Sequence, residues 1–177
     1  MLVERIGQPA ETPWSLAFDP EVLIILRSTL QVALPEEGCA LLLGCRQPSG
    51  WLLQHIWPCR NVWHPGIAAL PEAVGECMDG TPPPSRCNRF ALDPREQLLA
   101  QRWARQRGFD VIGTAHSHPQ GNATPSRRDR DWLRFPSLMV IQGADLRLRA
   151  WWLEPETALC TALVKDTDES DLPLRSV

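Results

Sequence analysis

The stretch "CALLLGCRQPSGWLLQHIW", residues 39–57, decides the fold, because it predicts two strands joined by a turn. Residues 39–45 form a wholly apolar run between turn-forming residues, which is typical of a buried strand. Residues 46–50, "RQPSG", carry the proline and glycine of a turn. Residues 51–57 then predict the partner strand, so the stretch indicates a β-hairpin in the core.

A helix is predicted on each side of this hairpin, at residues 19–34 and at residues 93–108. Both begin with an aspartate-proline pair, in which Asp19 and Asp93 suit the N-cap and the proline suits the first helical position. Gly108 suits the C-terminal cap of the second helix. The hairpin is therefore expected to be flanked by helices.

The second half of the chain predicts one more strand, a short helix and a β-meander. A short strand is also predicted at residues 89–92, before the second helix. After that helix come a predicted strand at 109–118, the short helix at 125–135, and the three strands of the meander at 137–142, 146–154 and 157–165. Residues before position 19 are expected to be loose. This order favours an α/β fold with a single mixed, largely antiparallel sheet flanked by helices.

A chain of 177 residues fits one domain, which we assign to residues 1–166. Residues 64–88 are rich in proline and glycine, and we expect them to form a mobile surface insertion, because structureless segments of this length are uncommon inside a compact domain. Residues 167–177 are polar and are expected to form a flexible C-terminal tail.

Composition excludes several classes of protein. The net charge of −3 argues against a dedicated nucleic-acid binder, and no apolar run is long enough to span a membrane. The start of the chain lacks the apolar core of a signal peptide, so a cytoplasmic location is expected. The six cysteines form no C-x-x-C pair, which argues against a zinc ribbon or a disulfide framework.

The stretch "AHSHPQGNATPSRRD", residues 115–129, concentrates metal-binding side chains. His116 and His118 lie on the same face of a strand, where they form either a metal pincer or a core histidine beside a surface one. Ser126 and Asp129 share the first turn of the next helix. They form either a capping box or, with Asp129 as third ligand, an open two-histidine, one-aspartate site typical of catalytic zinc.

A hydrolytic metal site also needs a general base that is not a ligand. Glu36 and Glu37 stand directly before the predicted strand at residues 39–45, and either carboxylate could carry the proton. The alternative is that both are ordinary acids between a helix and a strand.

Together, "PEEGCALLLG" (residues 35–44) and "HSHPQGNATPSRRD" (residues 116–129) resemble the JAMM metallopeptidase family, also called MPN-plus or JAB1/MPN. The signature of that family is an upstream glutamate, then H-[ST]-H-P, six residues and S-x-x-D. The match covers most of the chain and implies the cytidine-deaminase-like JAB1/MPN fold in its stand-alone prokaryotic form.

The resemblance implies a role for each matching residue. The zinc (Zn2+) ligands would be His116, His118 and Asp129, and Ser126 would stabilise the oxyanion of the tetrahedral intermediate. In the family the catalytic glutamate precedes a C-G-L-L-x-G-like stretch, which selects Glu37 over Glu36. The stretch departs from the family at Ala40, where glycine is usual. The choice of Glu37 therefore depends on the other matching residues of the stretch, and the implied roles are unchanged.

The implied function is hydrolysis of a peptide or isopeptide bond after the C-terminal Gly-Gly of a ubiquitin-like or sulfur-carrier protein. The alternatives are a non-catalytic scaffold, a RadC-like DNA-associated protein and a small-molecule amidase. A homodimer remains open.

Six further polar residues stand in or near these stretches. Asn61 is interpreted as structural, and His55 and His64 have no ligand partner at a suitable spacing. Arg127, Arg128 and Arg130 form either a solvated helix face or a steering patch for a carboxylate-bearing tail.

Overall fold

One mixed sheet organises the protein in the computed structural model, which describes residues 15–48, 50–67, 82–131, 133–154 and 160–162. Within these residues the strand order is β1-β3-β2-β4-β5-β6-β7. The strands are β1 (Ser15–Phe18), β2 (Cys39–Gln47), β3 (Gly50–Cys59), β4 (Asp110–Ser117), β5 (Ser137–Gln142), β6 (Leu148–Leu153) and β7 (Cys160–Ala162). The helices are α1 (Pro20–Gln31), α2 (Pro94–Gln106) and α3 (Arg127–Asp131).

The predicted hairpin, β2 and β3, lies inside the sheet between β1 and β4. β2 pairs antiparallel with β3 on one side and with β4 on the other. The β5-β6-β7 meander is also antiparallel, whereas β1 runs parallel to β3 and β4 runs parallel to β5. The predicted fold class, a mixed and largely antiparallel sheet flanked by helices, is confirmed.

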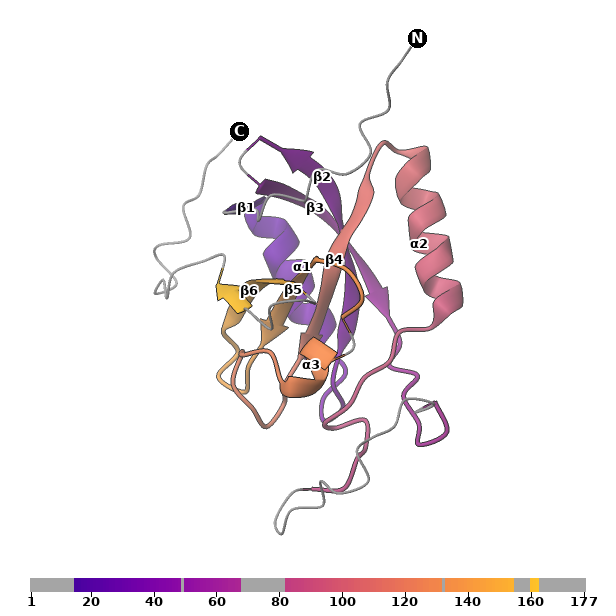
Figure 1. The fold of residues 1–177 in the computed structure, drawn as a ribbon, viewed down its shortest axis with the longest axis vertical. Coiled ribbons are helices and arrows are strands. Elements are labelled where there is room, and N and C mark those ends of the chain that lie inside the picture. Colours follow the sequence, from indigo (N-terminus) through magenta and orange to yellow (C-terminus); the bar gives the residue numbers. More distant parts are fainter. Residues whose placement is uncertain (1–14, 49, 68–81, 132, 155–159, 163–177) are drawn as a thin grey trace.

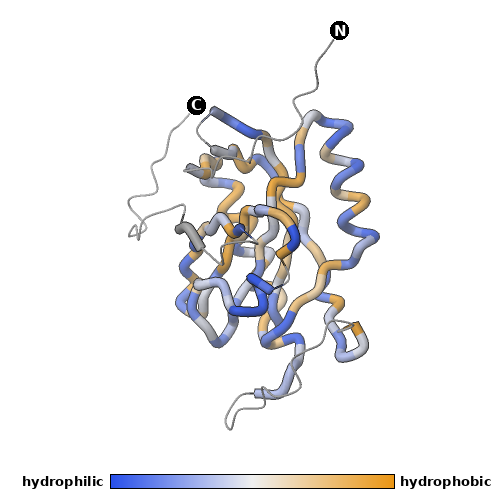
Figure 2. The backbone as a smooth tube through the Cα atoms, viewed as in Figure 1, coloured by the Kyte–Doolittle hydropathy of each residue, from blue (hydrophilic) through white to orange (hydrophobic). Residues whose placement is uncertain are grey.

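The helices α1 and α2 cover different faces of this sheet (Figure 1). The buried residues of α1 are Val22, Leu26 and Leu30. They belong to the main apolar cluster together with Ala40 and Leu42 of β2 and Leu53 of β3. On the other face, Trp103 of α2 contacts His55 and Trp57, with ring centroids 5.5 and 6.0 Å apart. Figure 2 shows the hydrophobic residues gathered in the central strands, whereas α3 is hydrophilic throughout.

The predicted caps of both long helices are present. The side chain of Asp19 accepts a hydrogen bond from Glu21 N, and Asp93 accepts one from Arg95 N. Gly108 follows the end of α2 with a φ of 75°, in the left-handed region that glycine adopts at little cost.

Three expectations about local structure are wrong. Ser15–Phe18 is a strand, because Leu16 and Phe18 pack against the core. Residues 89–92 form no strand, and only the isolated bridge between Asn61 and Leu92 pairs them. The helix predicted over 125–135 is limited to α3, and Leu133 beyond it packs against a second apolar cluster.

Other expectations lie outside the described residues. These include positions 68–81 of the predicted insertion, both ends of the predicted strand at 157–165, and the predicted tail at 167–177. In the described part of the chain, no helix is long and apolar enough to cross a membrane.

Candidate metal centre

The two halves of the sequence motif meet because β2 begins beside the end of β4. Cys39 pairs with His116 across the two strands. Just beyond this pair, Ser117 Oγ accepts a hydrogen bond from Gly38 N at 2.8 Å, and Ser117 N donates to Gly38 O at 3.0 Å. Glu37 is the residue before Gly38, so the β2–β4 pairing brings it to the histidine strand.

His116, His118 and Asp129 form a compact group of potential metal ligands. The two Nε2 atoms lie 2.9 Å apart. The carboxylate oxygens of Asp129 lie 3.4 Å from His116 Nε2 and 3.6 Å from His118 Nε2. Ligand atoms of a tetrahedral zinc ion, each about 2.0–2.1 Å from the metal, are about 3.3 Å from one another. The donor types and their spacing therefore fit zinc.

The surroundings of the two imidazoles differ, and those of His116 favour its neutral form. His118 Nδ1 lies 2.8 Å from Asn122 O, and because a carbonyl oxygen only accepts, Nδ1 carries a proton and Nε2 is the atom that faces His116 and Asp129. His116 is fully buried, and its ring stacks on Phe90 with centroids 4.4 Å apart. Burial lowers the pKa of His116, against the opposing effect of Asp129.

Asp129 is held as a carboxylate at the first turn of α3. Burial acts to raise its pKa, but hydrogen bonds from His116 and His118 lower the pKa below its ordinary value. For His118, burial acts to lower the pKa, and hydrogen bonds to Asp129 and to the Asn122 carbonyl outweigh it and raise the pKa. The group thus keeps an anionic oxygen facing two imidazole nitrogens.

Ser126 and Asp129 also form the capping box. Ser126 N donates to Asp129 Oδ2 at 2.7 Å, and Asp129 N donates to Ser126 Oγ at 3.2 Å. The two interpretations of S-x-x-D are therefore compatible, because the cap fixes the carboxylate beside the histidines. The Ser126 hydroxyl accepts in the cap, and its hydrogen bond to the Asp129 carboxylate helps to lower the pKa of that group.

Glu37 is a buried acid beside this group, with 6% of its surface exposed. Burial is the largest influence on its pKa and raises it to about 7. The charges of His118, Arg89 and Arg128 lower the pKa, and the charge of Asp129 raises it. A carboxyl group with a pKa near 7 can both accept and return a proton at neutral pH. Glu36 differs, because it is half-exposed and its carboxylate lies 3.7 Å from Arg86 Nη1.

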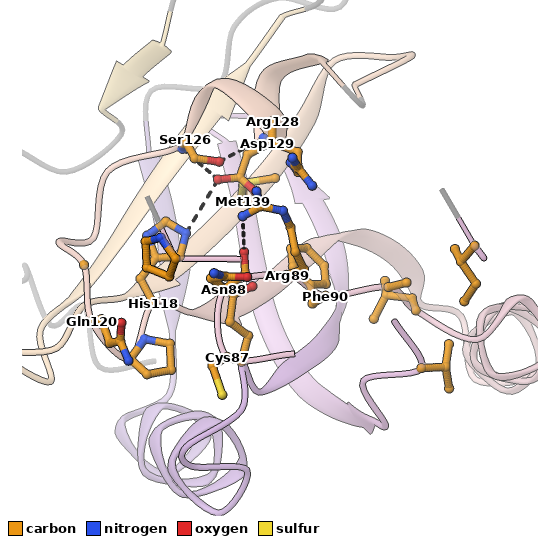
Figure 3. Close-up of a pocket in the computed structure, with 18 of the residues that line it drawn as sticks. Cys87, Asn88, Arg89, Phe90, His118, Gln120, Ser126, Arg128, Asp129 and Met139 are labelled. Carbon is orange, nitrogen blue, oxygen red and sulfur yellow. Dashed lines mark hydrogen bonds and ion pairs between the residues drawn. The ribbon is translucent and has the colours of Figure 1, made fainter. Parts of the chain in front are cut away.

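These side chains line one cleft of about 710 Å³ (Figure 3). Its polar wall includes Glu37, His118, Ser126, Arg128 and Asp129. Much of the remaining lining comes from residues 62–67 and 87–94, which contribute apolar side chains beside Asn88 and Arg89. A substrate longer than a single amino acid can therefore extend away from the metal-binding group along the cleft.

Asn61, which the sequence predicts to be structural, is a buried side chain that links separate segments of the backbone. Its Nδ2 donates to the carbonyl oxygens of Glu37 at 3.1 Å and Arg89 at 2.8 Å. Its Oδ1 accepts from Trp63 N at 3.0 Å and Ala91 N at 3.2 Å. One side chain thus joins the backbone of Glu37 to two segments of the cleft wall.

The structure shows two residues that hold the site in place and that the sequence does not predict, Phe90 and Trp151. Phe90 stacks on His116, and Trp151 Nε1 donates to Ala123 O at 2.8 Å, which anchors the loop between β4 and α3. Neither carries a local motif, because their roles arise only when the sheet forms. The remaining histidines lie elsewhere: His55 contacts Trp103, and His64 Nδ1 accepts from Gly66 N.

Residues 19–154 match the family model described as prokaryotic homologs of the JAB domain. A stretch of 71 residues is 31% identical to the desampylase of Pyrococcus furiosus. This match covers 40% of the chain and 51% of the relative, so the chain spans about half the length of that curated protein.

Two solved structures are similar in fold. A protein of Desulfitobacterium hafniense has a TM-score of 0.62 at 22% identity, with 78% of this chain and 84% of that chain covered. A protein of Salinibacter ruber has a TM-score of 0.56 at 26% identity, with 89% and 95% covered.

Proposed function

We propose that this chain, which belongs to the family of prokaryotic homologs of the JAB domain, is a zinc-dependent hydrolase. It would cleave a peptide or isopeptide bond after the C-terminal Gly-Gly of a ubiquitin-like or sulfur-carrier protein. One observation carries the proposal: a two-histidine, one-aspartate donor group shares a cleft with a buried glutamate whose pKa is raised to about 7.

In this proposal, His116, His118 and Asp129 hold zinc and leave a fourth position for the reacting groups. When bound, zinc would supply a Lewis acid that polarises the scissile carbonyl and makes water easier to deprotonate. The hydrogen bond from His118 Nδ1 to Asn122 O and the capping box at Asp129 support this role, because they fix the direction of two ligands.

Glu37 is the proposed general base and acid. It would take a proton from the attacking water and return a proton to the leaving amine. Its burial supports this function, because desolvation brings the pKa of the carboxyl group close to the pH at which it must both accept and donate. Asn61 binds the carbonyl oxygen of Glu37 and Ser117 binds the N–H of Gly38, so the peptide group that follows Glu37 is held at both its polar atoms, which restricts where the carboxylate can lie.

Ser126 is the proposed oxyanion donor. Its Oγ accepts the Asp129 N–H, so the hydroxyl is oriented by the same cap that orients the carboxylate. A donor fixed before the reaction stabilises negative charge on the substrate carbonyl oxygen without reorganisation.

The proposed substrate is a flexible C-terminal tail that ends in glycines. Glycine suits this position because it lets the backbone approach a crowded site. The similarity to a desampylase, an enzyme that by its name removes a protein modifier, supports a modifier or carrier protein as substrate.

The test uses a linear fusion in which a ubiquitin-like carrier ending in Gly-Gly is followed by a short peptide. Zinc-loaded protein should release the peptide at the glycine, and Glu37→Gln should abolish release while Glu36→Gln retains it. Replacing the terminal glycine of the carrier by valine should strongly impair cleavage. Equal cleavage of the glycine and valine fusions would instead favour a small-molecule amidase, and no cleavage with zinc bound would favour a scaffold.

A further inference from the structure

We propose that Phe90 is a positioning residue for the metal centre. Its ring holds the imidazole of His116 in the orientation that binds metal, in place of a hydrogen bond to His116 Nδ1. This inference rests on the proposed function, because it takes His116 as a zinc ligand, and it identifies a residue of the cleft wall on which the metal affinity depends.

The three proposed ligands are held in different ways. His118 Nδ1 donates to Asn122 O at 2.8 Å, and Asp129 accepts the cap hydrogen bond from Ser126 N at 2.7 Å. His116 Nδ1 is buried and has no hydrogen-bond partner among the residues that the structure describes. A histidine ligand usually donates this second N–H to an acceptor, which fixes the direction of the ring. The ring of His116 therefore needs another support.

Phe90 supplies that support by aromatic stacking. The centroids of the Phe90 and His116 rings lie 4.4 Å apart, and the ring planes are 21° from parallel. In this orientation His116 Nε2 lies 2.9 Å from His118 Nε2 and 3.4 Å from the Asp129 carboxylate. An imidazole that coordinates a cation becomes electron-poor, and such a ring is attracted more strongly to the negative face of a phenyl ring. Phe90 therefore favours the metal-bound imidazole over the free one.

The backbone on both sides of Phe90 is fixed by Asn61. Asn61 Nδ2 donates to Arg89 O at 2.8 Å, and Asn61 Oδ1 accepts from Ala91 N at 3.2 Å. The same amide donates to Glu37 O at 3.1 Å. Phe90 also lines the cleft (Figure 3). A residue of the cleft wall thus contacts a proposed ligand, and the side chain that holds its backbone also holds the proposed base.

The alternative is that Phe90 only fills space. An apolar side chain of similar size would then serve as well, and its loss would lower stability equally with and without metal. A positioning role instead requires the aromatic ring, and it acts mainly on the metal-bound state.

The first experiment measures zinc affinity by competition with a colorimetric chelator at fixed pH and salt. Phe90→Leu keeps an apolar side chain but removes the ring, and we expect it to weaken zinc binding by about tenfold or more, the scale of losing a partner of a metal ligand. Phe90→Tyr keeps the ring and should recover most of the affinity. The control is Leu92→Ala, which removes apolar volume from the same cleft wall and should leave zinc affinity unchanged.

A second experiment uses Co2+, whose visible spectrum reports the geometry of its donor atoms independently of affinity and activity. At saturating Co2+, Phe90→Leu should differ from wild type, whereas Phe90→Tyr and Leu92→Ala should reproduce the wild-type spectrum. Urea denaturation should show that Phe90→Leu loses more stability in the zinc-bound protein than in the presence of a chelator.

The outcomes separate this inference from the proposed function. If wild-type protein binds zinc and folded Phe90→Leu binds it as tightly with an unchanged Co2+ spectrum, or if Phe90→Tyr is as weak as Phe90→Leu, the positioning role is wrong while the hydrolase proposal stands. If Phe90→Leu does not fold, Phe90→Met makes the same comparison with an unbranched, adaptable side chain. Wild-type protein that binds neither metal would overturn both proposals.

Discussion

Ser117 Oγ accepts a hydrogen bond from the backbone N–H of Gly38 at 2.8 Å, although 79 positions separate the two residues. The bond is buried and joins the end of β4 to the start of β2. It therefore couples the strand that carries both histidines to the residue that follows Glu37. The middle serine of H-S-H is thus a positioning residue: it holds the proposed base in register with the proposed ligands.

Replacing this serine tests the coupling. Ser117→Ala leaves the buried Gly38 N–H without its side-chain acceptor, so we expect a loss of about 1–3 kcal/mol in the free energy of unfolding. Turnover should fall further than the folded fraction explains, because Glu37 loses its fixed position. Ser117→Thr keeps the hydroxyl and should recover most of both properties. Chemical denaturation and kcat measured on the same samples decide, and an alanine variant with normal kcat would show a purely structural role.

Ser126 has two roles that a single variant separates. As a cap alone, Ser126→Ala should cost about 1 kcal/mol of stability and leave the rate per folded molecule unchanged. As an oxyanion donor, it should also slow turnover by about 10²-fold or more while zinc stays bound. We expect both effects, because the hydroxyl accepts in the cap and can donate to substrate. An unchanged kcat with reduced thermal stability would remove Ser126 from the reaction.

The raised pKa of Glu37 has a consequence for stability in metal-free protein. The carboxyl group has an ordinary pKa of 4.5, and burial raises it to about 7 in the folded chain. The unfolded state therefore loses its proton first as pH rises, and wild-type protein loses stability between about pH 4.5 and 7. Glu37→Gln avoids this loss and should gain up to about 3 kcal/mol relative to wild type over that window.

Urea denaturation with a chelator present, at pH 4.5 and at pH 7.5, measures that gain. The control is Glu36→Gln, because Glu36 forms only a partly exposed ion pair with Arg86. It should show no comparable dependence on pH. A constant difference between Glu37→Gln and wild type across the window would mean that the carboxyl group is not held protonated by burial.

The elements that the sequence predicted best are those with strong local signals. The Asp-Pro starts of α1 and α2, Gly108, and the apolar run of β2 each carry the local chemistry that produces the element. Ser15–Phe18 was missed because a short strand of four residues has little periodicity, and its pairing with β3 is supplied by the finished sheet.

In the candidate site, too, the features with a local signal are predictable from the sequence, and those made by distant segments are not. The spacing of His116, His118 and Asp129 is local enough to predict that they meet, and the structure brings them together. The hydrogen bonds of Asn61 and the stacking of Phe90 on His116 join distant segments, so only the folded chain reveals them. The sequence alone leaves capping and metal binding as alternatives for S-x-x-D, whereas in the structure the Asp129 side chain both accepts the cap hydrogen bond and faces His116.

The most direct test of the proposed hydrolase is the zinc content of purified protein and its variants, measured by elemental analysis after reconstitution and desalting. We predict about one zinc per chain in wild type and in Glu37→Gln, and loss of zinc in His118→Ala and Asp129→Asn, with the folded state of each variant checked by circular dichroism. Wild-type protein that acquires no zinc, or a folded His118→Ala variant that retains it, would contradict a zinc centre at His116, His118 and Asp129.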